Sequence, residues 1–80
     1  MSRPATIPRY VQIAEDTMLD LFGVDLWAMR AEDRNAVIVA ACDADQDGRP
    51  EDGDSYVGAA VYEHWHDVRS ERKRHVGVDL

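Results

Sequence analysis

Cysteine and long apolar runs are scarce in this sequence, and each scarcity excludes a class of protein. The single cysteine, Cys42, cannot form an internal disulfide and leaves no cysteine-rich zinc framework. The longest apolar run, Ala36–Cys42, is far shorter than the roughly 20 residues that a membrane span needs. The N-terminal segment carries arginines but no apolar stretch of the signal-peptide kind. We therefore expect a cytoplasmic protein with no membrane partner.

Sequence motifs of enzymes are also missing. The serines stand in no nucleophile-elbow context, and no glycine-rich phosphate loop is present. Cys42 lies in an apolar run, where a cysteine is more often a small core residue than a thiolate nucleophile. We therefore expect no enzymatic activity.

What the sequence does contain is typical of one small folded domain. It has 80 residues, of which 45% are hydrophobic and 31% charged, with a net charge of −7. We expect a flexible arm over residues 1–7, a single helical domain over 8–76 and a C-terminal tail over 77–80. A chain of this size has a thin core, so it often depends on an ion, a partner or self-association. A homodimer is therefore an open alternative.

Apolar residues at three-to-four spacing predict a helix over residues 8–22. Pro8 suits the first helical position, and Gly23 suits the end. Asp25 can cap a short second helix. The same spacing predicts a last helix that starts at Asp54 or Ser55 and ends near residues 75–77. The two expected apolar stripes consist of Tyr10, Ile13, Ala14, Met18, Leu21 and Phe22, and of Val57, Ala60, Val61, Trp65 and Val68.

The segment Ala36–Cys42 fits two structures. Its three consecutive β-branched residues favour a buried strand, whereas its alanines and the preceding charged residues favour a helix. We expect the helix. The predicted fold is therefore all-α, with three to four short helices and an acidic loop of twelve residues, 43–54, between the last two. The alternative is an α+β fold with a hairpin formed by residues 36–42 and 56–61.

Charge is distributed unevenly along the chain. Residues 43–54 hold six acidic residues and one arginine, a net charge of −5. Residues 69–75 hold four basic residues and one glutamate, a net charge of +3. The chain is therefore a dipole with an acidic middle and a basic end.

The acidic segment 43–54 resembles an EF-hand calcium loop. Acidic residues stand at loop positions 1, 3 and 5, and Gly48 stands at position 6, where the chain turns sharply. Position 12 is aspartate instead of glutamate, Pro50 has no N–H for pairing with a partner loop, and no second loop follows. The resemblance implies a Ca²⁺ or Mg²⁺ site with ligands from Asp43, Asp45, Asp47, Arg49 (through its carbonyl), Glu51 and Asp54. Otherwise we expect no cofactor.

The same acidic segment also predicts a docking surface. An acidic, non-enzymatic small domain suits a partner protein with a basic groove, and mimicry of nucleic acid is one version of this idea. Our leading hypothesis is a regulator or inhibitor that binds its partner through Asp43, Asp45, Asp47, Glu51, Asp52 and Asp54.

The basic end supports a third hypothesis, direct binding of nucleic acid. Its candidate phosphate contacts are Arg69, Arg72, Lys73 and Arg74. The chain as a whole has a pI near 4.7, so its acidic segment would repel a polyanion. We therefore rank nucleic acid below a protein partner.

Overall fold

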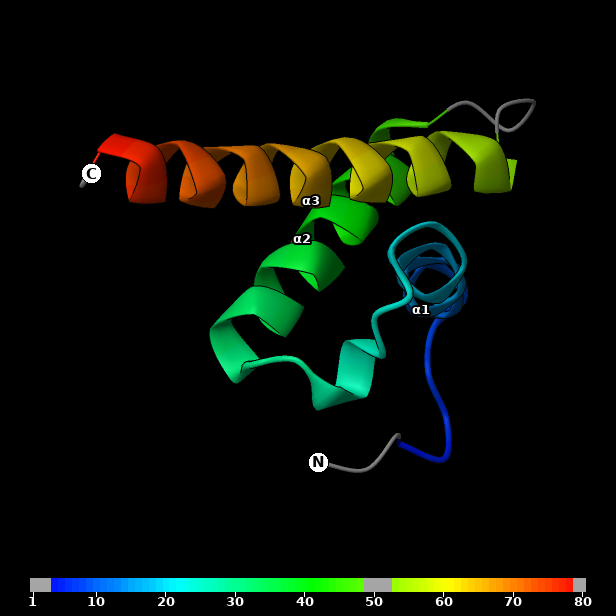
Figure 1. The fold of residues 1–80 in the computed structure, drawn as a ribbon. Helices are drawn as coiled ribbons and strands as arrows, with labels where there is room; N and C mark the ends of the chain where they lie inside the picture. The colour runs from blue at the N-terminus through cyan, green and yellow to red at the C-terminus, as the bar shows by residue number, and fades with distance from the viewer. Residues whose placement is uncertain (1–3, 49–52, 79–80) are drawn as a thin grey trace.

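The computed structural model describes residues 4–48 and 53–78, with side chains as far as Lys73, and these residues form helices without any strand. Helix α1 (Arg9–Phe22) is followed by a short 3-10 helix, η1 (Leu26–Ala28), and by helices α2 (Ala31–Asp47) and α3 (Gly53–Val78). Figure 1 shows α3 lying across the other helices. The all-α prediction is confirmed. Both segments of the alternative hairpin are helical.

Local signals set the bounds of α1: Gly23 ends the helix as predicted, whereas Pro8 lies just before the first helical residue, in an extended conformation, and not at that position. The carbonyl of Pro8 accepts hydrogen bonds from the amides of Val11 and Gln12, both at 3.1 Å. The helix ends at Gly23, which adopts a left-handed conformation with φ of 66°. The carboxylate of Asp25 then accepts a hydrogen bond from the Trp27 amide at 3.0 Å and starts η1.

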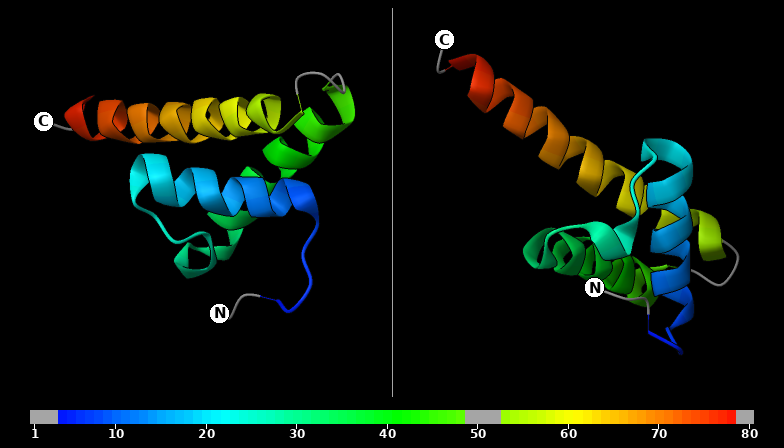
Figure 2. Two further views of the ribbon diagram at one scale, coloured as in Figure 1. Left: turned by 90° about the vertical axis from the view of Figure 1, so that its right-hand side faces the viewer. Right: turned by 60° about the horizontal axis from the view of Figure 1, so that its bottom comes forward.

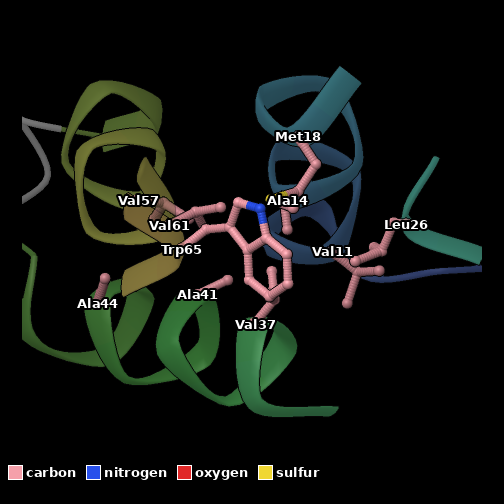
Figure 3. Close-up of a cluster of buried hydrophobic side chains, with 10 residues drawn as sticks. All are labelled: Val11, Ala14, Met18, Leu26, Val37, Ala41, Ala44, Val57, Val61 and Trp65. Carbon is pink, nitrogen blue, oxygen red and sulfur yellow. The ribbon is translucent and has the colours of Figure 1, made fainter. Parts of the chain in front are cut away.

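The three long helices enclose one core. Helices α1 and α3 pack against each other at an oblique angle, since α1 is seen end-on in Figure 1 where α3 lies across the view, and α2 packs against both (Figure 2). Trp65 from α3 lies at the centre of the core, with side chains of α1 on one side and of α2 on the other (Figure 3). The buried apolar residues are Val11, Ala14, Met18, Leu26, Val37, Ala41, Ala44, Val57, Val61 and Trp65.

The predicted apolar stripe of α3 is confirmed, but that of α1 needs correction. Val57, Val61 and Trp65 are buried, and the other two members pack against them. On α1, Leu21 was expected in the core but is 59% exposed, whereas Val11 is buried without having been expected. Leu21 points away because the face of α1 that meets α2 and α3 is centred on Ala14 and Met18, both with no exposed surface.

The predicted acidic loop is wrong for its first five residues. Helix α2 continues through Asp47, and Gly48 follows it in an extended conformation in place of the sharp turn at loop position 6. The helix continues because Ala41 and Ala44 are buried against the core, which stabilises about one and a half more turns than the acidic residues suggest. Helix α3 starts at Gly53, so Asp54 lies in its first turn rather than capping it.

In the part of the chain that the structure describes, none of the helices combines the length and the apolar character needed to cross a membrane.

Candidate protein-interaction surface

The described aspartates of the acidic segment gather where α2 ends and α3 begins. We call these four residues, Asp43, Asp45, Asp47 and Asp54, the acidic end. All four are exposed. The other candidate residues of this segment, Arg49, Glu51 and Asp52, lie outside the described residues.

Helical backbone disperses the carboxylates that an EF-hand loop would bring together. Successive residues of an α-helix are rotated by about 100°, so Asp43 and Asp45 lie on opposite sides of α2, whereas Asp47 lies one turn from Asp43. Among residues 4–48 and 53–73, no group of three His, Cys, Asp or Glu side chains could hold a metal ion. Three of the six proposed ligands are thus spread around a helix. Calcium binding stays a prediction, since two of the other ligands are not described.

The electrostatic setting of the acidic end differs between its two helices. Asp43, Asp45 and Asp47 occupy the C-terminal turns of α2, where the helix dipole is negative, and the last turn of α2 contains no basic residue. Asp54 instead lies in the first turn of α3, where the dipole favours an anion. The carboxylate of Asp54 also accepts a hydrogen bond from Arg9 of α1, which raises the pKa of that guanidinium. Of the four carboxylates of the acidic end, the three on α2 therefore have the least favourable electrostatic environment.

The negative charge of Asp45 also affects the pKa of a side chain on α1. The pKa of the Tyr10 phenol is raised first by its hydrogen bond with Cys42 and the charge of that group, then by burial, and last by the negative charge of Asp45. Cys42 is partly buried beside α1, as expected for a small residue at the edge of a core.

The basic end of α3, which we define as Arg69, Arg72 and Lys73, differs from the acidic end because two of its three charged side chains make contacts within the fold. The Arg69 guanidinium lies 5.4 Å from the centre of the Phe22 ring. The Arg72 guanidinium lies 5.5 Å from the centre of the Trp65 ring and donates a hydrogen bond to Asp33 at 2.6 Å. Lys73 is exposed, and the side chain of Arg74 lies outside the described part. Two of the four candidate phosphate contacts thus hold α3 to α1 and α2.

The ion pair between Arg72 and Asp33 joins α3 to the first turn of α2. The Asp33 side chain is only 14% exposed. The hydrogen bond from Arg72 is the main cause that holds the pKa of Asp33 below its ordinary value, and the positive charges of Arg72 and Arg30 add to it. The same contact raises the pKa of Arg72. This pair therefore contributes to the packing of α3 on α2.

A groove opens between α1 and α3 on the side away from α2. It has a volume of about 430 Å³. Leu21, from α1, and Tyr62, from α3, are its large side chains, and they are 59% and 41% exposed. Tyr62 stacks between the rings of Phe22 and His66, with ring centres 5.5 and 5.7 Å away. The residues that line the groove are Thr17, Leu21, Ser55, Gly58, Ala59 and Tyr62.

Sequence reasoning missed this groove entirely. Its floor is made of small residues that carry little signal individually, and Leu21 was assigned to the core because it has the spacing of a core residue. One signal in the sequence could have indicated the groove. Ser55 and Ala59 are small residues one helical turn apart, next to Gly58, and they lie on a different face of α3 from its buried stripe.

Comparison of the chain with known protein families, with curated proteins and with solved structures found no match.

Proposed function

We propose that the protein is a non-enzymatic interaction module whose acidic end docks into a basic groove of a partner protein. The observation that carries this proposal is the position of Asp43, Asp45 and Asp47. These three exposed carboxylates stand at the negative end of a helix dipole, where they oppose helix stability. A basic partner surface would neutralise them.

The contrast with other charged groups supports docking over a purely structural role. Several charges elsewhere have partners within the fold, such as Arg9 with Asp54 and Arg72 with Asp33. The three α2 carboxylates, in contrast, have no basic residue beside them in the last turn of α2. Exposed charges of one sign steer association with an oppositely charged surface and raise its rate at low salt.

The test is a charge-neutral variant of the acidic end, Asp43→Asn, Asp45→Asn and Asp47→Asn together. Its matched control, Asp16→Asn, Asp20→Asn and Glu63→Gln, removes the same charge from exposed positions on α1 and α3. Both variants and the unmodified chain are titrated by calorimetry with a panel of purified basic nucleic-acid-binding domains, at low and at physiological salt.

The expected result is salt-sensitive binding that the acidic-end variant loses and the control keeps. Equal loss in both variants would mean that only net charge matters, and binding by neither the unmodified chain nor the control would contradict the proposal.

A thermal melt separates docking from ion binding. A ligand at 100 times its dissociation constant adds about 2.7 kcal/mol to the free energy of unfolding. Melts in EDTA and in millimolar calcium should coincide. A calcium-selective rise in Tm that the acidic-end variant lacks would make the segment an ion site instead.

A further inference from the structure

We propose that the groove between α1 and α3 is an interface between two copies of this chain, in which the two α3 helices pair antiparallel. This inference concerns a different surface from the acidic end and does not depend on the proposed function. The contact would be made by a row of side chains along α3, which we call the α3 stripe: Ser55, Ala59, Tyr62, His66, Arg69 and Lys73.

The α3 stripe has the spacing of a helix-pairing seam. Its members are separated alternately by four and three residues, so they form one row along the helix, in which Ala59 and Tyr62 are the apolar members. The stripe does not coincide with the buried face of α3, which is formed by Val57, Val61 and Trp65. Within one molecule, the N-terminal half of the stripe lines the groove and leaves Tyr62 exposed. This part of α3 therefore has an apolar surface that a second helix would cover.

The stripe is complementary to itself when reversed. It is symmetric about position 64, so an antiparallel copy places Lys73 beside Ser55 of the partner and Arg69 beside Ala59 of the partner. Each long side chain thus meets a small one, and its aliphatic stem can cover the apolar floor of the groove. Tyr62 and His66 already stack within one chain. At the centre of the interface, Tyr62 of each copy meets His66 of the other. Self-complementarity of this kind is what a two-fold interface requires.

Charge favours the same arrangement. The Ser55 end of the groove carries two carboxylates, Asp54 on α3 and Asp16 on α1, which share the single guanidinium of Arg9. An antiparallel copy brings its Arg69 and Lys73 to this end. A parallel copy would instead place the basic residues of the two chains together. The surplus of negative charge at one end and of positive charge at the other therefore selects a second copy in reversed orientation.

The shape of α3 makes the contact accessible. The helix has 26 residues, which corresponds to a length of about 39 Å. Figure 1 shows its C-terminal turns extending past both α1 and α2. The C-terminal half of the stripe, in which Arg69 keeps its contact with Phe22 of α1, can therefore reach the groove of another molecule.

The first test is the oligomeric state. Sedimentation equilibrium of the full chain should give a dimer mass that falls toward the monomer on dilution. Ala59→Arg places a cation opposite the partner's Arg69 and should give a monomer. The control Ala36→Arg makes the same change at an exposed alanine of α2 and should remain dimeric. Circular dichroism melts show whether each variant is folded.

The second test reads the register. In a Cys42→Ser background, Ser55→Cys and Lys73→Cys chains are treated with a short bis-maleimide, separately and mixed. Covalent dimer should form mainly in the mixture. A monomer at every concentration, a dimer that Ala59→Arg leaves intact, or equal cross-linking of the separate variants would each overturn the proposal.

Discussion

The two charged ends of this molecule differ in what their charges do. At the basic end, Arg69 and Arg72 lie over aromatic rings of neighbouring residues, and Arg72 also binds Asp33 of α2. At the acidic end, the three aspartates of α2 are exposed and stand against the helix dipole. The basic end therefore stabilises the fold, whereas the three aspartates of α2 lower the stability of their helix. The aspartates of the acidic end can therefore bind a partner without breaking an ion pair of the fold, whereas Arg72 would have to share its pair with Asp33.

The largest expected effect concerns Trp65, the core residue whose ring lies against Arg72 of the basic end. Trp65→Ala should lower the free energy of unfolding by about 3–5 kcal/mol, because it empties the centre of the core and removes the ring under Arg72. A small domain has about that much stability in total, so the variant should be largely unfolded at room temperature in a circular dichroism melt.

Trp65→Phe is the matched control for that change. The indole N–H of Trp65 is buried without a hydrogen-bond partner among the described residues, so phenylalanine keeps a ring there and loses no hydrogen bond. A Tm for Trp65→Phe as low as that of the alanine variant would contradict the central role given to ring packing.

A smaller effect should separate the two neighbouring cations of the basic end. Arg72→Gln removes the ion pair with Asp33 and the contact with the Trp65 ring, and we expect it to lower Tm by roughly 4 °C or more. Lys73→Gln removes the same charge from the next residue, which is exposed, and should lower Tm much less. Equal losses would mean that total charge, rather than the contacts of Arg72, stabilises the fold.

Low pH should remove the stability that Asp33 contributes through its ion pair with Arg72. Because the pKa of Asp33 is lower in the folded chain than in the unfolded chain, its contribution is complete above about pH 4 and is lost as the pH falls through the folded value. Unfolding by urea, followed between pH 7 and pH 2, should show Asp33→Asn less stable than the unmodified chain at neutral pH and nearly equal to it at the acid limit.

Asp20→Asn, at an exposed position of α1, accounts for the general effect of removing one negative charge. A gap between Asp33→Asn and the unmodified chain that stays constant down to pH 2 would show that the ion pair is not its source.

The smallest effect has the opposite sign and lies at the acidic end. Asp45→Asn combined with Asp47→Asn should raise Tm by about 1–3 °C, since it removes two negative charges from the C-terminal turn of α2. Asp54→Asn, at the other helix of the acidic end, should lower Tm because it breaks the pair with Arg9. A fall in Tm for the first variant would show that the α2 aspartates have a structural role.

The local features of the fold could be predicted from the sequence. The extent of α1, its end at Gly23 and the buried stripe of α3 depend on periodicity and on capping residues, which are properties of short segments. The path of α2 could not be predicted in the same way. Alternating aspartates are typical of a loop, but the burial of Ala44 against α3 keeps the backbone helical as far as Asp47.

The contacts between helices had no signal in the sequence. Arg9 and Asp54 are 45 residues apart, and Asp33 and Arg72 are 39 residues apart, so neither pair follows from local spacing. The four described aspartates of the acidic segment are exposed, as a docking surface needs, but their arrangement around a helix required the structure. The groove depends on where α1 meets α3, and therefore on the packing of the whole core.

The long α3 helix also governs how the protein moves through a solution or a column. The radius of gyration is 13.4 Å and the molecule measures 46 by 29 by 19 Å, whereas a spherical domain of 80 residues has a radius of gyration of about 11.6 Å. An elongated particle diffuses more slowly than a sphere of equal mass. On a gel-filtration column calibrated with globular standards, a monomer of this chain would elute at the apparent mass of a larger species. Mass must therefore come from sedimentation equilibrium or light scattering.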